Sequence, residues 1–291
     1  MANNEYPVEK VNETTELALV SRTFPVAKTN AVIQKARTKL SLFEQKMLAY
    51  AISKINPVTS GKPELHYTLE IRDICAVCGL YTDSGKVYAL IRKAFKRLLT
   101  PTDDWVRLTD AEGVDSYVPF RWLEKVRFTP KKGIIDIMWD EEIAPFVFDL
   151  KRCYFSYPLQ DILAMRSSYS LRLYELLSSY APMRSYSFEL DTLRSLLYDS
   201  ETVHGYDRLA DFRKRIIDPA VEEINTYTGM DVSYELVMSN RKCTHIRFSM
   251  GTKNPMEMLR AKITVDEALD GFSYDRLTFN SLQTLPAAPS E

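Results

Sequence analysis

Apolar and polar residues alternate with a helical period over one long stretch of the chain, residues 206–228. Its apolar positions are Leu209, Phe212, Ile216, Ala220, Val221 and Ile224. This spacing puts them on one face of a helix, where they can pack against a core. Gly229 follows directly and favours a helix end, because glycine adopts the left-handed cap conformation at little cost. We therefore predict an amphipathic helix here.

Shorter patterned segments flank this helix on both sides. Residues 190–197 have helical spacing, whereas residues 232–237 and 243–248 alternate between apolar and polar, as strands do. The connection between the two strands ends in Arg241 and Lys242, so the predicted hairpin has a basic tip. A short helix, a turn, a long helix and a hairpin in this order are typical of a winged helix-turn-helix, a unit that reads DNA.

The basic residues of the long helix lie mostly off its apolar face. On an ideal helical wheel Lys214 and Arg215 point away from the stripe, and Arg208 lies at its edge. We expect these three side chains, together with the basic hairpin tip, to contact DNA. Arg213 falls on the apolar side of the wheel, which leaves two interpretations open: it packs inside the protein, or it bends round to a phosphate.

Residues 86–99 form the most regular amphipathic pattern of the chain. The apolar positions are Val87, Leu90, Ile91, Ala94, Phe95 and Leu98. The opposite face carries Lys86, Arg92, Lys93, Lys96 and Arg97, with no acidic residue between 86 and 99. A simply solvated helix normally mixes both signs, because opposite charges one turn apart stabilise it. The one-sided cationic face therefore favours contact with DNA phosphates, and a solvated surface is the alternative.

The two halves of the chain repeat each other. Residues 66–71 (HYTLEI) resemble residues 185–190 (SYSFEL), 119 positions further on. An apolar helix precedes each of them, over residues 41–54 and 169–180. Each is also followed by a short helix, a polar loop, a long helix with basic residues and a hairpin. We infer a duplicated unit and an α+β fold, with two tandem winged helix-turn-helix domains related by internal pseudo-symmetry.

Polar and weakly patterned segments set the predicted boundaries. We expect a mobile arm over residues 1–29, an N-terminal winged-helix domain over 30–150, a C-terminal winged-helix domain over 151–250 and a tail over 251–291. Two domains are also what a length of 291 residues suggests, because a single hydrophobic core seldom grows beyond that size.

Composition limits the class of protein further. The net charge of −1 excludes a chain coated in positive charge, so any nucleic-acid surface has to be a local patch. No apolar run approaches the roughly 20 residues that span a bilayer, and the polar, acidic N-terminus is unlike a signal peptide. The four cysteines form no disulfide framework. We therefore expect a cytoplasmic protein with no membrane partner.

Three motifs that resemble ligand sites are incomplete. Residues 79–87 look like a phosphate loop, but the spacing is one residue too long and Val87 replaces the Ser or Thr that would hold magnesium. Cys75 and Cys78 have metal-like spacing without a second pair. The acidic pair at 222–223 has no constellation around it and is expected on a solvated surface. We predict no catalytic residue, no metal site and no cofactor.

Four segments of the chain together resemble a known family. They are residues 30–55, 167–180 and 211–235 (DFRKRIIDPAVEEINTYTGMDVSYE), with THIRF at 244–248 closing the hairpin. In combination they are similar to the initiator Rep proteins of theta-replicating plasmids, which bind iteron repeats at the origin. The resemblance implies two winged-helix domains: the C-terminal one reads bases in the major groove, and the N-terminal one contacts neighbouring DNA.

The resemblance also implies a function and partners. The expected protein binds double-stranded origin DNA, helps to open the origin and recruits a host helicase or its loader, without being an enzyme. A monomer–dimer equilibrium is expected, in which the dimer represses the initiator's own gene. Arg208, Arg213, Lys214 and Arg215 fall at the family's base and phosphate contacts. Lys214 stands where an Arg would bind guanine bidentately, so the target sequence cannot be transferred from a relative.

The same resemblance places the dimer interface in the N-terminal domain. Alternating runs there predict strands over residues 105–108, 117–128 and 133–139. The middle run is long, β-prone and aromatic, and an uncovered edge of this kind pairs readily with another chain. Pro119 near its start limits the ladder, because it donates no backbone hydrogen bond. Two interpretations stay open: this strand pairs between two copies, or it lies inside its own sheet.

Two other classes of function compete with an initiator. A winged-helix transcriptional regulator with no replication role would use the same fold, and only the family resemblance favours replication. An enzyme of replication, such as a primase or a nickase, is disfavoured. The chain has only three histidines, His66, His204 and His245, which cannot form the HxH metal motif of a nickase.

Overall fold

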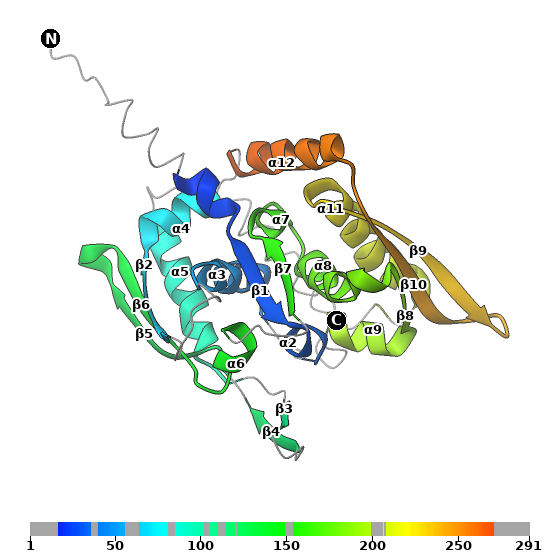
Figure 1. Ribbon diagram of the computed structural model, residues 1–291, viewed down its shortest axis with the longest axis horizontal. Coiled ribbons are helices and arrows are strands. Elements are labelled where there is room, and N and C mark those ends of the chain that lie inside the picture. Colours follow the sequence, from blue (N-terminus) through cyan, green and yellow to red (C-terminus); the bar gives the residue numbers. More distant parts are fainter. Residues whose placement is uncertain are drawn as a thin grey trace, which may run out of the picture.

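The structure, a computed structural model, describes most of the chain (Figure 1). The described residues are 17–35, 40–55, 64–80, 85–101, 105–109, 115–119, 121–148, 154–198, 206 and 208–270. Within these ranges no helix is both long and apolar enough to cross a lipid bilayer. Helices and strands are mixed in both halves, which confirms the α+β class.

The N-terminal winged-helix unit is built around a buried helix, α3 (Leu42–Ser53). A capping box starts it: the Ser41 hydroxyl accepts a hydrogen bond from the Glu44 N–H, and the Glu44 carboxylate accepts one from the Ser41 N–H. The elements that follow are β2 (His66–Glu70), α4 (Ile71–Cys78), α5 (Gly85–Leu98), β3 (Trp105–Thr109), β4 (Asp115–Pro119), β5 (Leu123–Thr129), η1 (Pro130–Lys132), β6 (Ile134–Trp139) and α6 (Ala144–Val147).

The second half of the chain repeats the order of buried helix, strand, helices and hairpin around helix α8 (Ser168–Tyr180), which is buried along most of its length, but β3 and β4 have no counterpart among its described elements. Two short elements precede α8, namely β7 (Tyr154–Pro158) and α7 (Gln160–Leu163). The elements that follow α8 are η2 (Ala181–Met183), β8 (Ser185–Glu189), α9 (Leu190–Leu197), α10 (Leu209–Phe212), η3 (Arg213–Ile217), α11 (Asp218–Tyr227), β9 (Met230–Ser239), β10 (Lys242–Thr252) and α12 (Pro255–Asp270).

The two units have sheets of the same topology. The strand order is β2-β6-β5 in the first and β8-β10-β9 in the second, so the last strand lies in the middle of both. Leu69 of β2 is paired with Ile135 of β6, and Phe188 of β8 is paired with Ile246 of β10 in the equivalent place. All four side chains are buried. The predicted pair of winged helices related by pseudo-symmetry is confirmed, and their hairpins project from opposite ends of the molecule (Figure 1).

A two-stranded sheet joins the two halves. Strand β1 (Pro25–Thr29) pairs antiparallel with β7. From β1, Lys28 forms a buried ion pair with Glu175 of α8, with 2.5 Å between Nζ and Oε1. The Tyr157 hydroxyl of β7 donates a second hydrogen bond to the same carboxylate oxygen, also at 2.5 Å. Burial alone would raise the pKa of Glu175, but the charge and hydrogen bond of Lys28 outweigh it, so the pKa is lowered.

Two predictions about the N-terminal part were wrong. Residues 17–29, expected within a mobile arm, contain a helix over 17–22 and strand β1. The segment PVAKT shows no alternation of apolar and polar residues, and it is pairing with β7 that makes it a strand. The single strand expected over 117–128 is instead two strands: β4 pairs with β3, whereas β5 pairs with β6. The boundary expected near residue 150 lies outside the described residues.

Helix α12 corrects the expectation that residues 251–291 form only a weakly patterned tail. It begins three residues after β10 and packs on α11 and α7 through Ala261, Val265 and Leu269, which are buried. In Figure 1 it lies across one edge of the molecule, from the second unit toward α4 of the first. The pattern was missed because its outer face is also apolar, so the sequence shows no one-sided stripe. The exposed apolar residues are Met256, Met258, Leu259 and Ile263.

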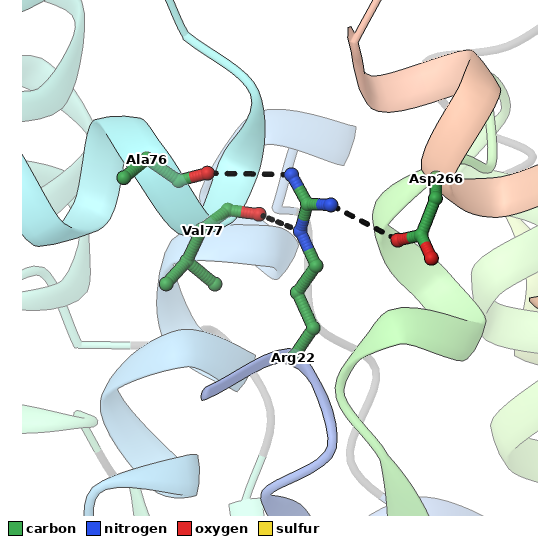
Figure 2. Close-up of polar contacts among 4 residues, drawn as sticks. All are labelled: Arg22, Ala76, Val77 and Asp266. Carbon is green, nitrogen blue, oxygen red and sulfur yellow. Dashed lines mark hydrogen bonds and ion pairs between the residues drawn. The ribbon is translucent and has the colours of Figure 1, made fainter. Parts of the chain in front are cut away.

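The far end of α12 is fixed to the first unit by Arg22, whose side chain is almost fully buried (Figure 2). The guanidinium donates from Nε to the Val77 carbonyl at 3.0 Å and from Nη2 to the Ala76 carbonyl at 3.3 Å. Its Nη1 lies 3.0 Å from Asp266 Oδ1 on α12. These carbonyls are at the C-terminal end of α4, where a cation is favoured by the helix dipole.

Gly79, which ends α4, shows how closely α12 approaches. Its φ of 65° is in the left-handed region, as is common for a helix C-cap. A Cβ placed there would also lie 2.6 Å from the backbone carbonyl oxygen of Leu269. Backbone conformation and close contact therefore both require glycine at this position, and α12, α4 and the helical segment before β1 form one joint between the units.

Candidate DNA-binding surface

The long helix predicted to contact DNA consists of α10, η3 and α11, which form one continuous helical segment over residues 209–227 with a π turn in its middle; we call it the recognition helix. Residues 213–217 form η3, and the Asp218 N–H donates to the Arg213 carbonyl, five residues back. Pro219 explains the irregularity. It has no N–H for the Arg215 carbonyl, and its ring would clash with that carbonyl in a regular α-helix. π turns of this kind are frequent at functional sites.

The π turn is anchored on its inner side by adjacent apolar residues. Ile216 and Ile217 are both fully buried, which a regular amphipathic helix rarely allows for two neighbours. Phe212 before the turn and Ala220 after it are also buried. The predicted apolar stripe is thus mostly confirmed, but Ile217 joins it, because the wider turn rotates this residue toward the core. The basic residues 213–215 all belong to the five residues of the π turn.

Three of the predicted contact residues are exposed on this helix. Arg208 immediately precedes α10, and Lys214 and Arg215 lie on the outer side of the π turn. Arg215 is close to Asp211, with 4.0 Å between Nε and Oδ1, but both side chains are solvated, so this pair contributes little to stability. Lys214 has no hydrogen-bond or ion-pair partner within the described part of the chain. These side chains are available to a ligand.

Arg213 instead lies against the wing, which is the hairpin formed by β9 and β10. Its Nε donates to the Tyr234 hydroxyl of β9 at 3.0 Å, and its guanidinium carbon lies 5.8 Å from the centre of the Tyr234 ring. The Tyr234 hydroxyl in turn donates to Asp218 Oδ1. The hydrogen bond to Tyr234 raises the pKa of Arg213, and partial burial followed by the contact with Asp218 raises the pKa of Tyr234. Arg213 therefore lies against Tyr234 and is half-buried, so it is not enclosed in the core, and a contact of its outer nitrogens with a phosphate stays a prediction.

The wing is fixed to the recognition helix by hydrogen bonds at its base. The Asn225 side chain of α11 donates to the Val232 carbonyl of β9 and accepts from the Val232 N–H, both at 2.8 Å. Lys253, after β10, donates from Nζ to the Thr228 carbonyl at 3.0 Å and to the Asn225 carbonyl. These donors satisfy the free carbonyls at the end of α11. Helix and wing therefore form one rigid element.

The tip of the wing carries Arg241 and Lys242, and both are exposed. Asn240 and Arg241 form a two-residue turn between Ser239 and Lys242, with φ of 49° and 65°. Positive φ at both positions matches the twist of a hairpin, although Arg is an unusual residue there. The hairpin is longer than predicted, because β9 and β10 each extend beyond the expected strands at both ends.

The basic helix α5 of the first unit closely follows its prediction. Val87, Ile91, Ala94, Phe95 and Leu98 are buried. On the other side Lys86, Arg92, Lys93 and Lys96 are exposed, and Arg97 is half-buried. None of these five cations forms an ion pair with another residue in the described ranges. The helix belongs to a different unit from α11, so the predicted contact residues form two separate patches.

Sequence reasoning missed the polar partners of the recognition helix. Tyr234 and Asp218, which hold Arg213, were not among the predicted site residues, although Pro219 inside a helical pattern was a visible sign of a local break. Of the acidic pair expected on a solvated surface, Glu222 is exposed, whereas Glu223 is only partly exposed. Its carboxylate accepts from the Arg166 N–H, at 3.1 and 3.2 Å to its two oxygens. Burial raises the pKa of Glu223.

The incomplete ligand motifs show no site in the described residues. Cys75 and Cys78 are buried in α4, and burial raises their pKa values to about 11 and about 12, so both remain thiols at neutral pH. No group of three His, Cys, Asp or Glu side chains in the described ranges is arranged to hold a metal ion. The glycine-rich segment places Gly79 at the end of α4 and Gly85 at the start of α5; residues 81–84 between them lie outside the described residues.

Known proteins resemble both halves of the chain. A family model described as "Initiator Replication protein, WH1" matches residues 25–178, and one described as "Initiator Rep protein, WH2" matches residues 189–250. A replication initiation protein of Escherichia coli is 23% identical over 200 residues, which are 67% of this chain and 60% of that protein. An uncharacterized 27.6 kDa protein of Escherichia coli is 25% identical over 129 residues, 43% of this chain and 52% of that protein. The matches thus span about half to three fifths of the length of these relatives.

A solved structure shares the fold. The Pi initiator protein, crystallised in complex with iteron DNA, superposes with a TM-score of 0.63 at 16% identity, covering 80% of this chain and 99% of that chain. At this identity the likeness concerns the fold alone. The family is shown by the WH1 model, because residues 25–178 are more than half of the chain. The protein therefore belongs to the initiator replication protein family, with the family's first and second winged-helix domains in tandem.

Proposed function

We propose that the protein initiates plasmid replication by binding iteron repeats at the origin through its C-terminal winged helix. The observation that carries this proposal is the exposed basic π turn of the recognition helix. Lys214 and Arg215 project from a turn whose inner side, Ile216 and Ile217, is locked in the core. Family membership supplies the context of replication, and the related fold of the Pi initiator was crystallised with iteron DNA.

The two units take different parts in this binding. In the second, a short recognition helix with a wing suits the major groove, where base edges present distinct donors and acceptors. Arg208, Arg213, Lys214 and Arg215 are the proposed contacts there, with Arg241 and Lys242 on the backbone nearby. In the first, Lys86, Arg92, Lys93, Lys96 and Arg97 on α5 are proposed to bind phosphates of neighbouring DNA, without reading sequence.

Self-association through β5 is a further part of the proposal. In the order β2-β6-β5 this strand lies at the sheet edge, and no described strand pairs with its outer side. Lys125 and Arg127 on β5 are exposed, and edge lysines commonly limit unwanted pairing, so the equilibrium between monomer and dimer is proposed to be labile. In this scheme the monomer opens the origin and recruits host helicase or its loader, and the dimer represses the initiator's gene.

Footprinting on the DNA that flanks the gene tests the function. We expect protection of tandem direct repeats whose centres are related by whole helical turns, about 10–10.5 base pairs each. A plasmid that carries those repeats should then replicate only when the protein is supplied. Protection confined to one inverted repeat at the promoter, with no effect on plasmid maintenance, would instead identify a transcriptional regulator.

A further inference from the structure

Tyr234 connects the two ends of the π turn. Its hydroxyl accepts a hydrogen bond from Arg213 Nε and donates one to Asp218 Oδ1. Arg213 is the first residue of the turn and Asp218 follows the last, and the backbone already joins them through the Asp218 N–H and the Arg213 carbonyl. Positions five residues apart lie on different faces of a regular α-helix. The π turn brings them within reach of a single phenol.

The phenol also fixes the orientation of the guanidinium. A tyrosine hydroxyl can donate one hydrogen bond, and here it donates that bond to Asp218. The lone pairs of the oxygen therefore face Arg213. The guanidinium lies over the Tyr234 ring, where a cation is attracted to the π face. The hydrogen bond uses Nε, and the contact with the ring uses the side of the guanidinium that faces Tyr234. Nη1 and Nη2 make no hydrogen bond to any described residue.

We propose that Tyr234 is a positioning residue for DNA recognition, which holds the Arg213 guanidinium so that its two terminal nitrogens are presented to the DNA. This inference rests on the proposed function of the second winged helix. Arg normally loses side-chain freedom when it binds a base or phosphate, and an Arg already held by Nε loses less. The wing thereby contributes to recognition through the helix, in addition to any contact that its tip makes.

The test is Tyr234→Phe in the full chain, which keeps the ring and removes the hydroxyl. Affinity for iteron DNA should fall roughly 3- to 10-fold, the effect of one hydrogen bond. Binding to a scrambled duplex should change less, because phosphate contacts remain. Tyr227→Phe on α11 is the matched control, since no hydrogen bond of its hydroxyl is found among the described residues, and it should bind as the wild type does.

A double-mutant cycle separates positioning from a general structural role. Once Arg213→Ala has removed the guanidinium, adding Tyr234→Phe should cause no further loss of affinity. Thermal melts of each variant show whether the fold is intact. If Tyr234→Phe melts early, Asp218→Asn provides a second variant: it keeps the phenol and weakens its acceptor, and should give a smaller loss that also disappears without Arg213.

The possible outcomes separate the two proposals. Equal losses from Tyr234→Phe with and without Arg213, or wild-type affinity for Tyr234→Phe, would overturn the positioning role and leave the proposed function standing. A wild-type chain that does not distinguish iteron DNA from the scrambled duplex would overturn both. The expected result is a loss on iteron DNA that depends on Arg213 and is absent in Tyr227→Phe.

Discussion

The long helices of the two winged-helix units, α5 and the recognition helix, both present a row of cations, but they hold them differently. On α5 the helix is regular and its exposed lysines and arginines have no ion-pair partner in the described residues. On the recognition helix a proline opens a π turn, and a wing tyrosine holds one of the arginines. Cationic side chains that move freely are suited to the uniform phosphate backbone. A guanidinium group held in one orientation is suited to the edge of a particular base.

The largest effect should come from removing the buried ion pair between Lys28 of β1 and Glu175 of α8, beside the two-stranded sheet that joins the units of the two helices. Lys28→Met leaves Glu175 charged and buried without its cation, and we expect unfolding to become easier by about 3–5 kcal/mol. Chemical denaturation at neutral pH measures this. Lys93→Met on the exposed face of α5 is the control and should lie within about 0.5 kcal/mol of the wild type.

The pH dependence of that variant should change sign. In the wild type the pKa of Glu175 is lowered by folding, so its contribution is present above the unfolded pKa and is lost as the pH falls through the folded value. Without Lys28, we expect burial, the largest influence on this group, to outweigh the Tyr157 hydrogen bond and the charge of Arg172, so that the folded pKa lies above the unfolded one. The variant should then gain stability on mild acidification. A variant that loses stability in acid as the wild type does would contradict this.

Base-specific binding by the recognition helix is the next largest effect. Lys214→Ala or Arg215→Ala should weaken binding to iteron DNA by about 1–3 kcal/mol if the side chain contacts a base, and the loss on scrambled DNA should be smaller. Gel-shift titrations on the two duplexes measure both. If neither single variant nor the double variant alters affinity for the origin, the π turn is not the reading surface and the contrast between the two helices fails.

Neutralising α5 should have a different signature. With Lys93, Lys96 and Arg97 changed to Gln, affinity should fall by a similar factor for every sequence. The slope of log K against log salt should become shallower by about 0.9 for each phosphate that the protein no longer neutralises. A slope equal to that of the wild type would mean that this face is only solvated surface.

The smallest effect concerns the outer edge of β5. Along this strand the backbone N–H groups point alternately toward β6 and away from it, so Lys125→Pro and Val126→Pro remove hydrogen bonds on opposite sides. One of the two should shift the dimer toward the monomer, at a cost of about 1 kcal/mol per hydrogen bond removed, with the second winged helix intact. Sedimentation measures the shift. Dimers that persist in both variants would place the interface elsewhere.

The regular parts of the fold were predictable, because their signals are local. The α5 stripe and the repeat at 66–71 and 185–190 needed only period and spacing, and both were confirmed. An ideal helical wheel did not predict the π turn. The wider turn at Pro219 rotates Ile217 into the core and changes the direction in which Arg213 points. Tyr234 was missed because its role depends on contact between a strand and a helix, which no local pattern contains.

Contacts between segments far apart in the sequence could not be predicted either. Arg22 and Asp266 are 244 residues apart, and neither stands in a motif that names the other. Strand β1 takes its form from β7, and α12 has apolar residues on two sides, one buried and one exposed. In each case the structure depends on which distant surfaces pack together. The local pattern of a single sequence does not show which surfaces these are.

The close packing of α12 on Gly79 holds the two units at a fixed distance and orientation. With Arg22 on Asp266 and no room for a Cβ beneath Leu269, the second unit has little freedom to swivel against the first. Where both units touch one duplex, their contacts should then require a fixed number of base pairs between them. Inserting about five base pairs, half a helical turn, would carry one contact to the opposite side of the DNA. Replacing Gly79 by a larger residue should loosen that spacing requirement before it abolishes binding by either unit.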